Sequence, residues 1–93
     1  MGKVHLSGYL EVPADRLDAV RAALPDHLAL TRAEPGCLLF SVKENPTLAD
    51  RFEVAETFAD EAAFEQHQHR AKASAWAAVT EGLARHYTIR VED

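Results

Sequence analysis

Apolar and polar residues alternate in four stretches of the chain, and alternation with a period of two is typical of β-strands with one buried face. The expected strands cover residues 3–12, 37–43, 52–58 and 86–91. In the first of them the apolar face holds Val4, Leu6, Leu10 and Val12. Gly8 lies on the same face, where the missing side chain leaves room for a close neighbour or a bulge.

Apolar residues three or four positions apart predict helices between these strands. The first helix begins near Asp15 and carries the stripe Leu17, Val20, Leu24 and Leu28. Pro25 lies inside this stripe and lacks a backbone donor, so we expect a kink or a new helical start there. A later helix begins after Asp60, whose side chain can cap it. A further helical piece over about residues 72–84 carries Trp76 and Leu83 on one stripe.

The resulting order, β-α-β-β-α-β, predicts a single α+β domain over residues 1–93, with a ferredoxin-like fold and an antiparallel sheet. The later strands carry their apolar faces on Leu38, Phe40 and Val42, on Phe52, Val54 and Phe58, and on Tyr87, Ile89 and Val91. Helices can cover one face of such a sheet, yet the opposite faces include Tyr9, Leu39 and Ala55. A second copy of the sheet would supply the missing layer, which predicts a homodimer.

Composition narrows the functional classes. The chain has 93 residues, 47% of them apolar, and a net charge of −5 with a pI near 5.4. This acidic balance argues against nucleic acid or an anionic membrane as partner. No apolar run reaches the ~20 residues of a membrane span, and the N-terminus lacks the apolar core of a secretory signal. The single Cys37 fits a reducing cytoplasm, with oxidation or cross-linking of a dimer as the alternative.

Two residues stand out as candidates for catalysis. His67 follows Ala63 and Phe64 at helical spacing and therefore points toward the sheet. It could be a base that removes a phenolic or enolic proton, or a partly buried histidine bonded to backbone at the helix end. Glu56 shares a strand face with apolar side chains and needs a partner there. It could orient His67, or accept hydrogen bonds from a helix amide, Arg32 or Arg51.

The stretch Glu34-Pro-Gly-Cys-Leu-Leu-Phe-Ser-Val-Lys-Glu-Asn-Pro, followed by residues 51–67 with Glu56 and His67, resembles the antibiotic biosynthesis monooxygenase (ABM) family, especially its quinol monooxygenase branch. The resemblance covers residues 4–91. It implies a dimeric α+β barrel, a histidine of this region in the substrate pocket and a glutamate in this strand.

The resemblance also implies that polar side chains of the first strand enter the cavity between sheet and helices. His5, Ser7 and Tyr9 are those side chains here, and they could orient an oxygen-rich aromatic ligand. The alternative is a solvent-exposed face or a dimer interface. Three aromatic residues are expected in the core first and in the pocket wall second: Phe40, Phe64 and Trp76.

Metal and cofactor sites are not expected. His67 and His69 point in nearly opposite directions on a helix, and His5, His86 and Cys37 complete no known ligand spacing. The haem-degrading branch of the superfamily uses an Asn, Trp and His set, which this chain does not reproduce. There is no glycine-rich phosphate loop or dinucleotide fingerprint, so flavin and nicotinamide are not supported either.

Three functions remain open. The first is a cofactor-independent monooxygenase that oxidises a small aromatic quinol or phenol with O2 after His67 removes a proton. The second is an isomerase or degradative enzyme acting on a small hydroxy-ketone signal compound through the same residues. The third is a non-catalytic dimeric protein that binds a small ligand, since one fold supports many functions.

Overall fold

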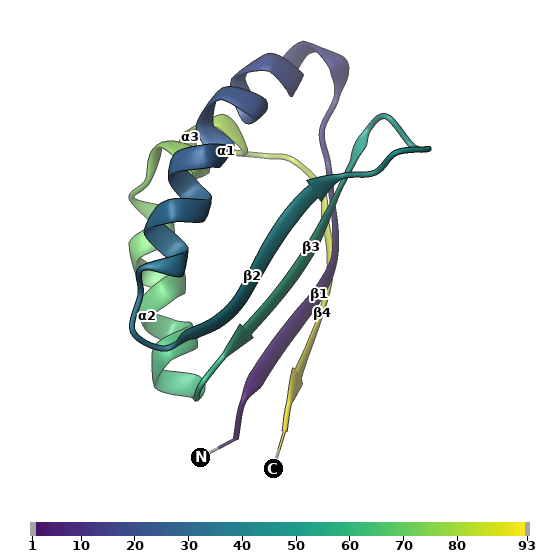
Figure 1. Cartoon of the computed structure of the whole chain (residues 1–93). Helices are drawn as coiled ribbons and strands as arrows, with labels where there is room; N and C mark the ends of the chain where they lie inside the picture. Colours follow the sequence, from purple (N-terminus) through teal and green to yellow (C-terminus); the bar gives the residue numbers. More distant parts are fainter. Residues whose placement is uncertain (1, 93) are drawn as a thin grey trace.

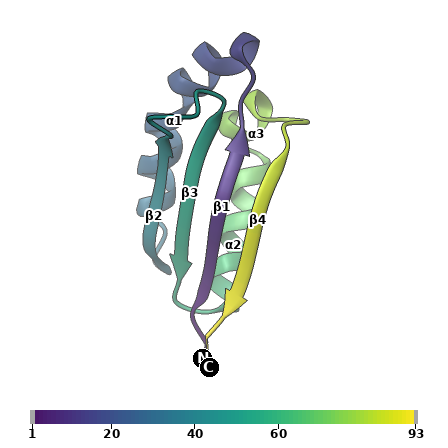
Figure 2. The same ribbon diagram turned by 90° about the vertical axis from the view of Figure 1, so that its right-hand side faces the viewer.

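A four-stranded antiparallel sheet forms one layer of the protein, and helices form the other (Figure 1). The computed structural model describes residues 2–92. Its elements are β1 (Val4–Glu11), the 3-10 turn η1 (Ala14–Arg16), α1 (Leu17–Arg32), β2 (Cys37–Glu44), β3 (Arg51–Phe58), α2 (Glu61–Lys72), α3 (Ala75–Val79) and β4 (Arg85–Val91). The sheet order β2-β3-β1-β4, visible in Figure 2, confirms the predicted ferredoxin-like fold.

The core lies between the sheet and the helices. Alternation in the strands sends one set of side chains to this side, as predicted, and the buried apolar members are Val4, Leu6, Leu10, Phe40, Val42, Phe52, Val54 and Phe58. Val20 of α1 is fully buried against them. The opposite face of the sheet carries no helix (Figure 1). Within residues 2–92, no helix is both long and apolar enough to cross a membrane.

Helix α1 runs without a break through Pro25, so the predicted new start at this residue is wrong. Proline removes one backbone hydrogen bond, which frees the carbonyl of Arg21. Pro25 lies on the exposed side of the helix, where water can bind that carbonyl. The helix therefore continues through this residue.

The last helical region is shorter than predicted. Instead of one piece over residues 72–84, α2 ends at Lys72 and α3 spans Ala75–Val79. Ser74 separates them because its side chain accepts a hydrogen bond from the N–H of Ala77 and so begins a new helix. The predicted cap at Asp60 is confirmed, with its carboxylate 2.8 Å from the N–H of Ala63.

A bulge at the start of β2 changes the predicted face of one residue. Cys37 pairs with Phe58 and Leu39 pairs with Thr57, which leaves Leu38 without a register partner. Leu38 is therefore 54% exposed instead of sharing the buried face of Phe40.

Gly8 is a point of close approach between β1 and β4, as its position on the apolar face suggested. It has φ of 145°, and a Cβ there would overlap the carbonyl oxygen of His86. We expect Gly8→Ala to lower the free energy of unfolding by about 2 kcal/mol or more, because the strands must separate or the backbone must strain. Urea unfolding measures this change. Ser7→Ala, one position away on the open face, is the control, and equal stability of the two variants would contradict the close approach.

Candidate functional site

His67 is the centre of a buried polar site beneath α2. Its side chain is 5% exposed. The imidazole stacks on Phe58 with ring centroids 4.9 Å apart and meets Phe40 at 5.5 Å. The helical spacing that predicted a sheet-facing side chain is confirmed. Burial lowers the pKa of His67, while the hydrogen bond and charge of Glu34 partly offset that effect. The ring is therefore mainly neutral at pH 7.

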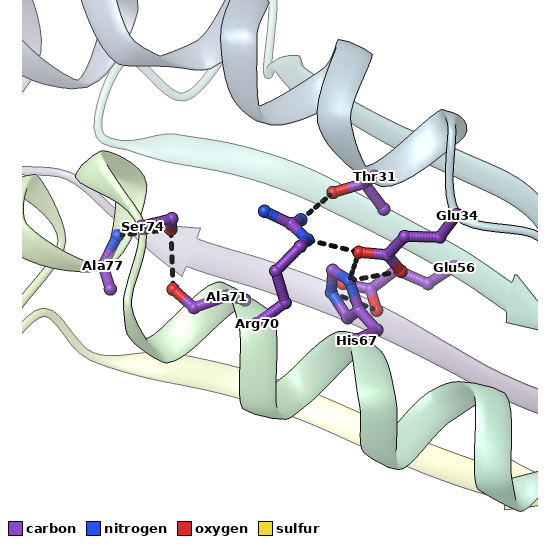
Figure 3. Close-up of polar contacts among 8 residues, drawn as sticks. All are labelled: Thr31, Glu34, Glu56, His67, Arg70, Ala71, Ser74 and Ala77. Carbon is purple, nitrogen blue, oxygen red and sulfur yellow. Dashed lines mark hydrogen bonds and ion pairs between the residues drawn. The ribbon is translucent and has the colours of Figure 1, made fainter.

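Glu34, in the turn between α1 and β2, holds the imidazole (Figure 3). Both of its oxygens lie 3.2 Å from Nδ1 of His67. Nε of Arg70 donates to Glu34 at 2.6 Å, and its Nη2 donates to Oγ1 of Thr31 at 3.0 Å. A carboxylate accepts hydrogen bonds, so Nδ1 must be the protonated nitrogen of the neutral ring. Nε2 then carries the lone pair that can accept a proton.

Glu56 lies on the other side of the imidazole. Its Oε1 is 3.9 Å from Nε2, too far for a hydrogen bond, and this buried oxygen has no partner. Burial, followed by the charge of Glu34, raises the pKa of Glu56 to about 7. The alternative pairing with Arg32 or Arg51 is wrong, because Arg32 donates to the carbonyl of Phe40 and Arg51 lies over the ring of Tyr9.

A pocket of about 370 Å³ opens beside this pair, between the sheet and helices α2 and α3. Its lining includes His67, Glu56, Trp76 and Tyr87. Trp76 is stacked on His27 with an angle of 3° between the rings and 4.7 Å between their centroids. Burial raises the pKa of Tyr87 to about 12, so its phenol keeps its proton. The pocket therefore combines flat aromatic walls with polar and titratable side chains that could orient a small ligand.

The other predicted pocket residues lie elsewhere. Phe40 packs beside His67, and Phe64 meets Phe58 edge-on in the core. His5, Ser7 and Tyr9 lie on the face of the sheet turned away from the helices, so their expected position in the cavity between sheet and helices is wrong. His5 is hydrogen bonded there to Thr57 and Glu92, and Tyr9 stacks on His86. The period of two in β1 gives the helix-facing positions to its apolar residues instead.

Three residues of the site were not identified from the sequence. His27 follows Val20 and Leu24 at helical spacing and precedes Thr31 by four, a pattern that could have placed it on the buried face of α1. Glu34 and Arg70 offered no such signal, because their contacts join positions far apart in the chain. Gly36, two residues after Glu34, lies so close to α2 that a Cβ would overlap that of Ala63.

This arrangement can accept a proton from a ligand. A neutral imidazole has Nδ1–H fixed on a carboxylate, and that carboxylate stabilises the ring once Nε2 is protonated. In hydrolases, a carboxylate likewise fixes the tautomer of the catalytic histidine and stabilises its protonated form. Glu56 can hold a proton near neutral pH and lies opposite Nε2. The site is thus suited to general acid–base chemistry on a hydroxyl or an acidic C–H group.

The chain is thus a ferredoxin-like domain with a pocket lined by a buried histidine and a buried glutamate. The chain belongs to the antibiotic biosynthesis monooxygenase family, whose model matches residues 3–79. No curated protein sequence matches the chain significantly.

Solved structures share the fold at low sequence identity. SnoaB, a cofactor-independent oxygenase from Streptomyces nogalater, is 11% identical with a TM-score of 0.78, covering 97% of this chain and 92% of its own. A proposed antibiotic biosynthesis monooxygenase from Caulobacter crescentus is 21% identical with a TM-score of 0.76, covering 96% and 88%. Rv0793 from Mycobacterium tuberculosis is 20% identical with a TM-score of 0.72, covering 98% and 93%.

The buried His27 should make the protein sensitive to acid. Burial, then the nearby charges of His67 and Arg70, lowers its pKa to about 4 from 6.5. The unfolded chain binds a proton at His27 from about pH 6.5, whereas the folded protein binds one only from about pH 4. The free energy of unfolding therefore falls between these two pH values, by at most about 3 kcal/mol. His27→Phe keeps a flat ring against Trp76, so its unfolding free energy should fall less between pH 7.5 and pH 4. Denaturant unfolding at both values tests this.

The exposed His69, replaced by Gln, is the control for the loss of a histidine. An unchanged pH dependence in His27→Phe would show that the buried imidazole does not titrate as described.

Proposed function

We propose that the protein is a cofactor-independent monooxygenase that oxidises a small aromatic quinol or phenol with O2. The observation that carries the proposal is the buried His67, with Nδ1 bound to Glu34 and Nε2 left as the proton acceptor beside the pocket. Membership of the antibiotic biosynthesis monooxygenase family supports the oxygenase class. The similar fold of SnoaB, a cofactor-independent oxygenase, supports chemistry without a cofactor.

The first step is removal of a proton from the substrate. Nε2 of His67 takes the hydroxyl proton, and the carboxylate of Glu34 stabilises the imidazolium that results. Arg70 keeps that carboxylate in place through its 2.6 Å contact. Because the pKa of His67 is lowered, the base is available near neutral pH.

The second step is electron transfer from the substrate anion to O2. The resulting radical pair forms a carbon–oxygen bond and gives a hydroperoxide. Loss of water from this intermediate leaves a carbonyl on the ring, so one oxygen atom enters the product and the other leaves as water. The substrate supplies all the electrons. Trp76, which is stacked on His27, lines the pocket and can hold the substrate ring beside the base.

Glu56 can supply the proton that the departing oxygen needs. Its pKa of about 7 keeps a large protonated fraction at neutral pH, and its Oε1 has no other hydrogen bond. We therefore assign Glu56 as the acid and His67 as the base. Glu34 is the positioning residue for the base, a role that the sequence had suggested for Glu56.

Replacement of His67 by Ala should lower protein-dependent oxygen uptake by about 10²- to 10⁴-fold, the usual contribution of a general base. Oxygen electrode traces with hydroquinones, naphthols and catechols, corrected for spontaneous oxidation, measure this rate. His69→Ala removes an exposed histidine from the same helix and should retain full activity. Full activity in the His67→Ala variant would show that His67 is not the base.

Enolisation of a small hydroxy-ketone is the second candidate, because His67 and Glu56 line the same pocket, 3.9 Å apart, and could move a proton between two substrate atoms. This reaction consumes no oxygen. Turnover of hydroxy-ketones under nitrogen, lost in His67→Ala, would favour it over the oxygenase. Ligand binding with no turnover of either substrate class would favour a non-catalytic binding protein.

The uncovered face of the sheet supports a homodimer. It presents Leu39, which is 49% exposed, together with Tyr9, over which the guanidinium of Arg51 lies at 4.0 Å. A second copy of this sheet would bury these side chains.

Leu39→Glu should convert the dimer to a monomer, because dimerisation would bury a charge. Sedimentation velocity reports the mass directly. Leu48→Glu changes a leucine of the β2–β3 loop with similar exposure and should leave the dimer intact. A wild-type protein that sediments as a monomer would refute the proposed association.

A further inference from the structure

Two cations line the His67 pocket without a carboxylate partner. Lys72 is the last residue of α2, and Arg85 is the first residue of β4. Among the ion pairs of residues 2–92, neither takes part in one. The chain has 15 acidic and 10 basic residues, so acidic partners are abundant elsewhere. Two cations without acidic partners in one pocket therefore indicate a place where an anionic group of a ligand could bind.

Neutral groups fix the position of Arg85. Its Nη2 donates to Oγ1 of Thr80 at 2.9 Å, and its Nη1 donates to the carbonyl of Leu83 at 3.1 Å. Thr80 is fully buried, and its hydroxyl donates in turn to the carbonyl of Trp76 at 2.8 Å. These contacts orient the guanidinium without neutralising it, and most of its N–H donors remain free.

The cations lie away from the acid–base pair along the pocket. Lys72 is five residues beyond His67 on α2, which corresponds to about 7.5 Å along the helix. Arg85 is four residues before Ile89, and Ile89 is level with Glu56 because both are register partners of Leu6. Four residues of strand span about 13 Å. The pocket therefore has a proton-transfer end and a cationic end.

Charges inside the pocket do not cancel this cationic end. The histidines of the lining, His27 and His67, are mainly neutral at pH 7 because burial lowers the pKa of each. Glu56 is the acidic group of the lining, and it lies at the other end. An anionic group of a ligand would thus find hydrogen-bond donors and positive charge at Lys72 and Arg85.

We propose that the substrate is an aromatic acid, whose carboxylate is bound by Lys72 and Arg85 while a hydroxyl at the opposite end of the ring system meets His67. The ring system lies along Trp76 and Tyr87, which also line the pocket, and Tyr87 is midway between Arg85 and Ile89 on β4. This inference rests on the proposed function for the position of the reacting hydroxyl. The binding of the carboxylate requires no reaction.

The test compares two ligands that differ in one group. 6-Hydroxy-2-naphthoate carries a hydroxyl and a carboxylate at opposite ends of the rings, and 2-naphthol lacks the carboxylate. Titration calorimetry under nitrogen, at low salt and pH 7, gives both dissociation constants without turnover. We expect the acid to bind about tenfold more tightly than 2-naphthol, as charge-assisted hydrogen bonds imply. Combined Lys72→Gln and Arg85→Gln substitutions should reduce this preference to within about twofold and leave 2-naphthol binding unchanged.

Arg90→Gln is the matched control, because it removes a cation from the opposite face of the same strand and should keep the preference. Arg85→Lys should retain part of the preference for the acid, because it keeps the positive charge. Lys72→Gln alone removes an exposed side chain and tests the charge even if the Arg85 variants unfold. Weak or equal binding of the two ligands, or a preference that survives loss of both cations, would overturn the proposal.

Failure of this proposal is separable from failure of the proposed function. Preferential binding of the acid by a protein that consumes no oxygen would retain the cationic end and reject the oxygenase. Oxygen uptake with neutral quinols, without any preference for acids, would retain the oxygenase and reject the binding of a carboxylate at the cationic end.

Discussion

The chain of contacts from Arg70 through Glu34 to His67 is the interaction on which the rest of the site depends. It joins the turn after α1 to α2 and fixes both above the sheet. A buried imidazole and a nearly buried carboxylate are costly unless each is bound. Here each satisfies the other, and Thr31 takes a further guanidinium donor. The same contacts that compensate for burial also set the tautomer of His67.

Much of the fold followed from patterns within single segments. Alternation located the four strands, and Asp60 marked the start of α2 because a cap needs only its own neighbours. Errors arose where the outcome depends on surroundings that a segment does not contain. Pro25 is tolerated because its side of α1 faces water, and Leu38 is displaced by a bulge that only the pairing with β3 reveals.

In the site, too, features set within one element could be predicted, and features set by contacts between distant segments could not. His67 and Glu56 could be proposed because each lies on a face defined by its own element, and both line the pocket. The carboxylate that binds the imidazole could not be identified, because Glu34 precedes His67 by 33 positions and lies in a turn without periodicity. The polar residues of β1 were assigned to the wrong side of the sheet. Their alternation was correct, but the side that the helices cover is chosen by the apolar residues.

The contact between Gly36 and Ala63 links backbone packing to the chemistry of the site. Gly36 follows Glu34 by two residues, and Ala63 precedes His67 by one helical turn. Their closeness sets how near the turn can approach α2, and with it how near the carboxylate can approach the imidazole. The geometry around His67 therefore depends also on two residues with no functional groups at all. The contact limits the combined size of the side chains at positions 36 and 63. A larger side chain at either position would lengthen the contact between the Glu34 carboxylate and the His67 imidazole, even though neither residue touches a reacting atom.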